Sequence, residues 1–302
     1  MKAEIRKTVE ALGAVSTDEA LRRAHTCPPP DRQEVVKVIH ELQALLFPLV
    51  YRREYPNMAD ETLLSQALYR LRDQLAAALR FRMEAGEAAE AAAEEICAAF
   101  AERLPEVKRL LLLDVEALYE GDPAAVSREE VMISYPGFRA ITIFRIAHEL
   151  YLLKAPLIPR IMTEYAHERT GIDIHPGATV GEYFFIDHGT GVVIGETTEI
   201  GSHAKIYQGV TLGATSTRKG QALSGTKRHP TLGDYVTVYS NASVLGGNTY
   251  IGSGSVIGGS AFVVESVPEN GRVFVKDQEI VIRQFGTPNR SGATRSSSAA
   301  NR

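Results

Sequence analysis

Apolar residues follow two different spacings along the chain, and the change between them falls near Gly171. Before that point they recur every three or four positions, as in DETLLSQALYRLRDQLAAAL over residues 60 to 79. Side chains at this spacing share one face of a helix, so the segment predicts an amphipathic helix with Asp60 as its N-cap. GEAAEAAAEEICAAFAERL and EVKRLLLLDVEALYEG also predict helices, and Pro105 between them is expected to end the first or begin the second.

After Gly171 an aliphatic residue recurs every six positions, and Gly often follows it. The members of this series are Ile174, Val180, Ile186, Ile194, Ile200, Ile206, Leu212, Leu232, Val238, Val244, Ile251, Ile257 and Val263. Helices and simple strands have shorter periods, so a period of six fits neither. It is typical of hexapeptide repeats, in which short strands form the flat faces of a parallel β-helix around inward aliphatic side chains. An antiparallel sandwich is the alternative, but about a dozen in-register matches are hard to obtain by chance.

Leu212 and Leu232 stand twenty positions apart, and the residues between them cannot fit in one coil. We therefore expect GATSTRKGQALSGTKRHPT, residues 213–231, to protrude as a loop, and long loops in compact repeats are often functional. The basic residues of this loop favour an anionic ligand only weakly. The predicted regions are an α-helical domain over 1–170, a β-helix domain over 171–270 and a C-terminal extension over 271–302, whose polar tail after about residue 285 should be disordered.

The composition is that of a soluble globular protein, with 44% apolar and 23% charged residues among 302. A net charge of −4 and the lack of a long basic block argue against a nucleic-acid partner. Cys27 and Cys97 are too far apart for a thiolate metal motif, and such sparse cysteine fits a reducing cytosol. No signal-peptide core opens the chain and no stretch approaches the ~18 apolar residues of a membrane span, so we expect a cytoplasmic protein without a membrane partner.

His188 is the candidate for acid–base chemistry, because it stands where a repeat usually has a small or neutral residue. Asp187 precedes it directly, and Asp173 lies earlier in the repeat. These residues and the Arg228-His229 end of the loop could converge at one edge of the coil. A histidine accepts a proton from a hydroxyl more readily when a carboxylate holds its other nitrogen. From spacing alone, however, an ordinary hydrogen-bonded histidine is the simpler interpretation.

Several longer motifs carry more information than the spacing does. DIHPGATVG, FIDHGTGVVIGET, QGVTLG, KRHPTLGD and NASVLGGNTYIGSGSVIGGS resemble the serine O-acetyltransferase family, over residues 115 to 270. The resemblance implies an N-terminal α-helical domain followed by a left-handed parallel β-helix, assembled as a homotrimer or a dimer of trimers. It also implies acetyl transfer from acetyl-CoA, the co-substrate, to L-serine, the first step of L-cysteine biosynthesis. No metal is expected, because a histidine-based site would need three convergent ligands and no short-range ligand spacing in the sequence supports one.

The resemblance also suggests a role for individual residues. His188 would be the general base and Asp173 its orienting carboxylate, with direct attack of the serine hydroxyl on the thioester. Asp122 and Asp187 would bind the ammonium group of serine. Arg228 and His229 would bind its carboxylate. The candidates for CoA contacts in a groove between subunits are Gly213, Ala214, Ala242, Gly259 and Ser260.

Two other histidines and the end of the chain lead to weaker expectations. His175 belongs to a motif but is expected to support a turn, and His203 is expected to be a surface residue. Relatives often end in Ile, which enters the active site of O-acetylserine sulfhydrylase, whereas this sequence ends SSSAANR, so we do not expect that complex. Two alternatives stay open. One is an acetyltransferase of the same architecture acting on another small hydroxyl or amine, and the other is a non-catalytic scaffold.

Overall fold

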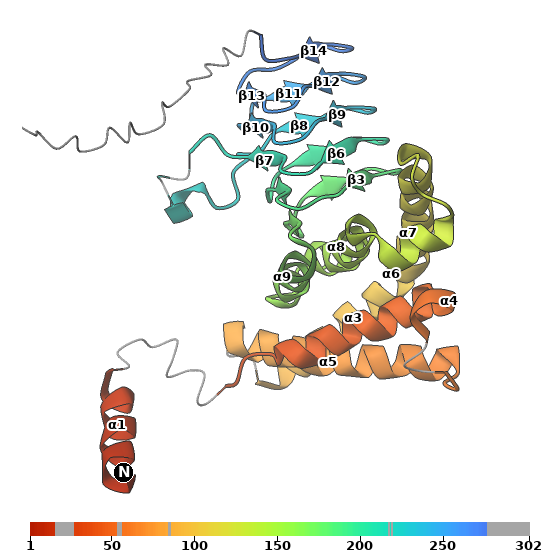
Figure 1. Cartoon of the computed structure of the whole chain (residues 1–302). Coiled ribbons are helices and arrows are strands. Elements are labelled where there is room, and N and C mark those ends of the chain that lie inside the picture. Colours follow the sequence, from red (N-terminus) through yellow and green to blue (C-terminus); the bar gives the residue numbers. More distant parts are fainter. Residues whose placement is uncertain (16–26, 53–55, 84–85, 217, 219, 277–302) are drawn as a thin grey trace, which may run out of the picture.

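The computed structural model describes residues 1–15, 27–52, 56–83, 86–216, 218 and 220–276. A helical region comes first and a coil of short parallel strands follows (Figure 1). The predicted order, helical domain and then a β-helix of hexapeptide repeats, is confirmed. The polar tail predicted to be disordered lies outside the described residues. The helices are α1 (Lys2–Val15), α3 (Arg32–Leu46), α4 (Pro48–Tyr51), α5 (Asp60–Met83), α6 (Gly86–Gly121), α7 (Arg128–Ser134), α8 (Pro136–Leu152) and α9 (Ile158–Thr170).

Two details of the predicted helices are wrong. Asp60 is the first residue of α5 rather than its cap, since the carbonyl of Ala59 accepts the first helical bond from Leu63. Its carboxylate still lies in the first turn, where the helix dipole favours negative charge. Pro105 lies inside α6 and does not divide it. A proline in a helix interior costs about 3 kcal/mol, which burial of Phe100 and Leu111 on either side of it helps to offset.

The whole β-helix, which is also called the coil, consists of three parallel sheets. Strands β1 to β13 enter sheets A, B and C in turn. Sheet A has the order β1-β4-β7-β10-β13, sheet B the order β11-β8-β5-β2, and sheet C the order β14-β12-β9-β6-β3. The strands are β1 (Asp173–Ile174), β2 (Thr179–Val180), β3 (Phe185–Asp187), β4 (Val193–Ile194), β5 (Glu199–Ile200), β6 (Lys205–Tyr207), β7 (Thr211–Gly213), β8 (Thr231–Leu232), β9 (Thr237–Val238), β10 (Ser243–Leu245), β11 (Tyr250–Ile251), β12 (Val256–Ile257), β13 (Phe262–Val263) and β14 (Arg272–Val273).

The six-residue series forms the interior of this coil. Ile174, Ile194 and Leu212 are register partners on neighbouring strands of sheet A, followed by Val244 and Val263. Every aliphatic residue of the predicted series is buried. One coil alone would expose this interior, so the stacking of coils supplies the hydrophobic stabilisation. Between β7 and β8 the chain leaves the coil and forms a short 3-10 helix, Gly220–Leu223, which projects to one side (Figure 1).

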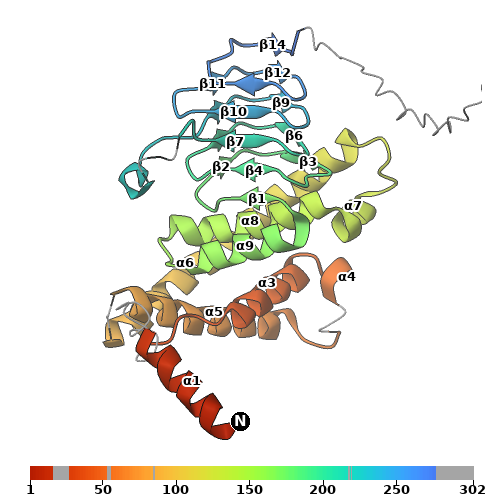
Figure 2. The same ribbon diagram turned by 60° about the vertical axis from the view of Figure 1, so that its left-hand side comes forward.

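The helical region lies against the first coil. Figure 2 shows α8 and α9 between that coil and the layer formed by α3 and α5. The long helix α6 belongs to both levels, since it packs on α5 and also reaches β3 (Figure 1). The position of α8, directly under the coil, matters for the site described below.

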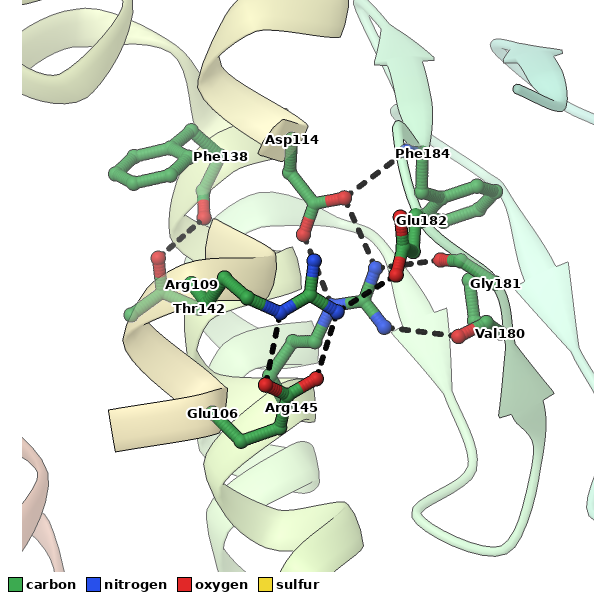
Figure 3. Close-up of polar contacts among 10 residues, drawn as sticks. All are labelled: Glu106, Arg109, Asp114, Phe138, Thr142, Arg145, Val180, Gly181, Glu182 and Phe184. Atoms are coloured by element: carbon green, nitrogen blue, oxygen red, sulfur yellow. Dashed lines mark hydrogen bonds and ion pairs between the residues drawn. The ribbon is translucent and has the colours of Figure 1, made fainter. Parts of the chain in front are cut away.

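A buried ion pair joins the two regions (Figure 3). Arg145 of α8 binds Asp114 of α6 through two bonds of 2.9 Å, and the two side chains are 5% and 0% exposed. Arg145 also donates to the carbonyls of Val180, at 2.8 Å, and Gly181, at 2.7 Å, while Asp114 accepts the N–H of Phe184 at 2.9 Å. The guanidinium, the carboxylate, the two carbonyls and the N–H group all find hydrogen-bond partners within this set. The ion pair therefore fixes the first turn of the β-helix on α6 and α8.

Candidate active site

The turns between sheets form three corners of the coil, and two of them bear the predicted residues. We call the turns from sheet C to sheet A the CA corner; they are residues 187–192, 207–210, 239–242 and 258–261. We call the turns from sheet A to sheet B the AB corner; they are residues 175–178, 195–198, 214–230 and 246–249. His188 lies at the CA corner, whereas Arg228 and His229 lie at the AB corner. The expectation that they converge at one edge of a single coil is therefore wrong.

At the CA corner His188 is held in an exposed position next to a carboxylate. Its side chain is 72% exposed, and its Nδ1 lies 3.5 Å from Oδ1 of Asp187. The backbone of His188 has a φ of 54°, in the left-handed region that a residue other than glycine occupies at a cost of about 1–2 kcal/mol. This conformation belongs to a tight turn, which turns the imidazole away from the coil interior. The ring is thus available to a ligand.

Asp122, which comes from the end of the helical region, joins this group. Its Oδ2 accepts the hydroxyl of Tyr135 at 2.5 Å, and its Oδ1 accepts the N–H of Ala124 at 2.8 Å. These bonds hold the pKa of Asp122 below its ordinary value, and the bond from Tyr135 has the largest effect. The charge of His188 lowers this pKa further. Conversely, the bond to Asp122 raises the pKa of Tyr135 to about 12, and the charge of Asp187 adds to this effect. Asp122 is therefore an ionised carboxylate in the field of His188.

Tyr135 and Tyr207 are the residues at this corner that sequence reasoning missed. Burial raises the pKa of Tyr207, and the charges of Tyr239, Asp187 and Asp122 raise it further, which places its hydroxyl in the same group. A signal for Tyr207 existed, because it follows Ile206 in the series just as Asp187 follows Ile186, and the two pair across sheet C. No comparable signal marks Tyr135, since it meets Asp122 through the fold of the helices.

Asp173 lies at the start of sheet A, one turn of the β-helix before the first CA corner. It is half-buried in β1 and pairs in register with Val193, the residue at which the first CA turn ends. Among the described residues its carboxylate makes no hydrogen bond, and the carboxylate within ion-pair distance of His188 is that of Asp187. The orienting role assigned to Asp173 stays a prediction.

The AB corner holds His229 in a different environment. Only 8% of this residue is exposed, and its Nδ1 accepts the N–H of Thr197 at 3.0 Å. Because Nδ1 is an acceptor, the proton of the neutral ring is on Nε2, which is left free to donate. Burial, and then the charge of Arg228, lowers the pKa of His229 to about 4. The ring lies over Gly195, where a methyl group would collide with Cδ2 and Nε2.

Arg228 is held beside it by an ion pair that the sequence did not predict. Its guanidinium pairs with Glu196, which also accepts the hydroxyl of Tyr151 at 3.1 Å. The N–H groups of Arg228 and His229 both donate to Oγ1 of Thr197, at 3.0 and 3.1 Å. Glu196 directly follows Gly195 in the repeat, at a corner position. A carboxylate at such a position was the signal by which the sequence could have identified it. A cavity of about 370 Å³ opens next to Glu196 and is also lined by Tyr151 and by basic residues.

The five small residues proposed for CoA divide between the same two corners. Gly213 and Ala214 lead into the AB corner, whereas Ala242, Gly259 and Ser260 lie at the CA corner. The methyl group of Ala242 is fully buried, and both its backbone groups bond within the coil, to Tyr239 and Thr211. Ala242 therefore faces the interior in this chain. The CoA contacts of the five residues stay predictions.

The two remaining histidines have structural surroundings. Nδ1 of His175 accepts the N–H of Gly177 at 3.0 Å, so its expected support of a turn is confirmed. His203 is half-buried, with its ring stacked between Tyr183 and Tyr235 at centroid distances of 4.4 and 4.5 Å. It is thus part of an aromatic ladder rather than a simple surface residue, because coil stacking places equivalent corner positions above one another.

Within the described ranges, no group of three or more His, Cys, Asp or Glu side chains could hold a metal ion. In the same part of the chain no helix combines the length and the apolar character that a membrane crossing requires.

Comparisons with known proteins agree on one family. A family model described as "Serine acetyltransferase, N-terminal" matches residues 55–143. A plasmid serine acetyltransferase of Synechococcus elongatus is 43% identical over 293 residues, which cover 88% of this chain and 91% of the relative. The serine acetyltransferase of Bacillus subtilis is 45% identical over 184 residues, which cover 59% of this chain and 82% of the relative.

Solved structures give the same result. Serine acetyltransferase 1 of Entamoeba histolytica, solved in complex with L-cysteine, is 38% identical with a TM-score of 0.70, covering 78% of this chain and 86% of that one. The Neisseria gonorrhoeae enzyme, solved in complex with serine, is 31% identical with a TM-score of 0.54, covering 79% of this chain and 95% of that one. Since the sequence and the fold both match, this chain belongs to the serine acetyltransferase family.

Proposed function

We propose that this chain transfers the acetyl group of acetyl-CoA to the hydroxyl of L-serine, giving O-acetyl-L-serine and CoA, as the first step of L-cysteine biosynthesis. The observation that supports this acceptor is the presence of two charged groups at two corners of the β-helix. The acidic group contains Asp122 and Asp187. The basic group contains Arg228 and the Nε2–H of His229. An amino-acid zwitterion requires both signs of charge, whereas a sugar acceptor requires neither.

His188 is proposed as the general base. It removes the proton of the serine hydroxyl while the oxygen attacks the thioester carbonyl of acetyl-CoA. The tetrahedral intermediate then collapses, the carbon–sulfur bond breaks, and the proton returns from His188 to the leaving CoA thiolate. Direct transfer needs no enzyme thiol. Burial raises the pKa of Cys97 to about 12, which makes this cysteine a poor nucleophile at neutral pH.

The carboxylate that orients His188 is proposed to be Asp173. Asp187, at 3.5 Å from Nδ1, is the competing candidate in the conformation described. A carboxylate that only binds the serine ammonium should affect mainly the serine KM, whereas one that orients the base should affect mainly kcat. Comparison of Asp173→Asn with Asp187→Asn therefore assigns the two roles.

We also propose that a complete site lies between two chains. The CA and AB corners are separated by the width of sheet A, so one chain presents both halves but does not bring them together. In a homotrimer with its axis along the coils, the CA corner of one chain would meet the AB corner of the next, with CoA in the groove between them. A dimer of trimers and a cytoplasmic location remain part of this proposal.

The test is CoA thiol release from acetyl-CoA with L-serine, compared with buffer, L-homoserine and a hexosamine. We expect release that depends on L-serine and falls at least about a hundredfold in His188→Ala. His203→Ala is the matched control, because this histidine lies in the aromatic ladder at another corner. Release with another acceptor but not with serine would reject the serine site and favour the alternative acetyltransferase. If none of these acceptors gives CoA release, the result would favour a scaffold.

A further inference from the structure

A cavity in the helical region has no role in the chemistry above. It lies where α3, α4, α8 and α9 meet and has a volume of about 210 Å³. Its lining residues are His40, Gln43, Tyr51, Arg139, Ile143 and Tyr165. None of these residues belongs to the CA or AB corner. Most of the lining side chains are polar, which is unusual for a gap between packed helices.

Gln43 is the most informative member of this lining. Only 6% of it is exposed, yet its amide forms no hydrogen bond with any described residue. Most polar side chains in the protein interior have a hydrogen-bond partner, so an amide without a protein partner is available to bind another group. Because the side chain lines the cavity, a group inside the cavity is in position to bind its amide.

Arg139 gives the cavity its charge. It lies in the first turn of α8, a helix of 17 residues that has no acidic residue in that turn and no side-chain cap. Among the described residues Arg139 forms no ion pair, although its charge is close enough to Tyr51 to counteract the rise in the pKa of that phenol. The helix dipole adds positive potential at the same place.

The hydroxyl groups of the cavity offer one further donor. Tyr51 donates its proton to the carbonyl of Met132 at 2.9 Å, so its oxygen can only accept. His40 Nε2 and the Tyr165 hydroxyl lie 3.1 Å apart. If Nε2 donates, the Tyr165 proton is free, and if Tyr165 donates, the proton of His40 is on Nδ1. In both cases one donor of this pair remains.

The surroundings contain no compensating negative charge. A smaller adjoining cavity of about 90 Å³ shares Tyr51 and Arg139 with the first and adds Arg169. The guanidinium of Arg169 lies 5.6 Å from the ring centre of Tyr165 and forms no ion pair within the described part of the chain. No Asp or Glu lines either cavity in that part of the chain. A cation would be repelled by Arg139 and would find no carboxylate among these lining residues, and an apolar molecule would leave Gln43 unpaired.

We propose that this cavity binds a small oxyanion, whose oxygens accept hydrogen bonds from the guanidinium of Arg139 and the amide group of Gln43. Sulfate, phosphate and a short carboxylate share this chemistry, because each presents oxygen acceptors to a guanidinium. The site is separate from the acetyl-transfer site, and its test uses no activity measurement.

The experiment is calorimetric titration of the full-length chain with sulfate, phosphate or succinate, in chloride buffer of constant ionic strength. We expect at least one of the three anions to bind at one site per chain, and the three titrations distinguish an inorganic anion from a carboxylate. Arg139→Gln should weaken this binding about tenfold or more, because a hydrogen bond to a charged group is lost. Arg72→Gln is the matched control, since Arg72 pairs with Asp73 on an exposed face of α5 and should leave binding unchanged.

Two further variants make the outcome decisive. Gln43→Leu should weaken anion binding while leaving the melting temperature in chloride unchanged or higher, because it removes an unpaired buried amide. Arg228→Gln should leave anion binding intact. The proposal is overturned if none of the three anions binds at millimolar concentration. It is also overturned if binding is lost in Arg228→Gln and kept in Arg139→Gln, since the anion would then occupy the AB corner.

Discussion

At the scale of single residues, two histidines of the proposed site have opposite surroundings. His188 is 72% exposed in its side chain, so its ring is accessible to the hydroxyl that it is proposed to deprotonate. His229 is 8% exposed and uses Nδ1 to accept from Thr197, so its useful form is neutral, with a proton on Nε2. A base that shuttles a proton and a donor that must stay neutral are thus separated by burial.

The environment of His229 predicts a pH dependence of folding stability. Its pKa falls from the ordinary value of 6.5 to about 4 on folding, so between these pH values the unfolded chain binds more protons. The free energy of unfolding should therefore decrease as pH falls from 6.5 towards 4, by at most about 3 kcal/mol from this group. Urea unfolding at pH 7 and pH 4.5 measures the change. In His229→Asn the free energy of unfolding should depend less on pH. An unchanged pH dependence would refute its assignment to His229.

Gly195 provides a second prediction at this scale. A methyl group there would collide with the His229 ring, so Gly195→Ala should displace the imidazole. We expect the serine KM to rise about tenfold, the cost of one charge-assisted hydrogen bond, with a smaller change for acetyl-CoA. Initial-rate kinetics measure both constants. Gly13→Ala is the control, because nothing lies within 4 Å of an added methyl there. Equal KM values in both variants would show that His229 does not bind serine.

At the scale of elements, α8 links the helical region to the coil. Tyr135, which precedes its first residue, binds Asp122. Gly137 approaches the carbonyl of Ile186 so closely that a methyl group would lie 2.5 Å from the oxygen. Further along, Arg145 binds Asp114 and two carbonyls of the first coil (Figure 3). One helix therefore positions both a carboxylate of the proposed site and the turn that bears His188.

This link predicts a large effect of Asp114→Ala. The substitution leaves the buried guanidinium of Arg145 without its counter-charge and the N–H of Phe184 without an acceptor. We expect a loss of about 3–5 kcal/mol in the free energy of unfolding. Arg109→Gln is the matched control, since Arg109 is 47% exposed and its ion pairs with Glu106 and Glu182 are screened by solvent and should contribute little. Similar urea midpoints for the two variants would contradict the role of the buried pair.

The elements also show what sequence can and cannot predict. Every aliphatic residue of the predicted series is buried, because one turn of the β-helix repeats the same local geometry and the spacing reports it directly. Val192, Val210 and Val236 are also buried but lie outside that series. Pro105 was misread, because tertiary packing on both sides of it decides whether α6 continues. Glu196 and Tyr135 were missed, because their partners Arg228 and Asp122 reach them only through the fold.

At the scale of the whole molecule, the separation of the two corners determines what an assembly must do. Sheet A lies between them, so a single chain exposes the acidic half of the proposed site on one edge and the basic half on another. A closed ring of identical chains repeats each contact and can pair every acidic half with a basic half of its neighbour. If sites form in this way, two inactive variants with damage on different corners should restore activity when they share an oligomer.

The variants for this test are His188→Ala, damaged at the CA corner, and Arg228→Ala, damaged at the AB corner. Each alone should be nearly inactive, whereas co-expression with two different tags and purification through both should recover activity. In a doubly tagged trimer, which contains both variants, one of the three interfaces has both halves intact, so about one third of full activity is expected. The matched control combines His188→Ala with Asp122→Ala, in which every interface has a damaged CA corner, so no activity should return. Doubly tagged oligomers that stay inactive in the first combination would instead place the complete site within one chain.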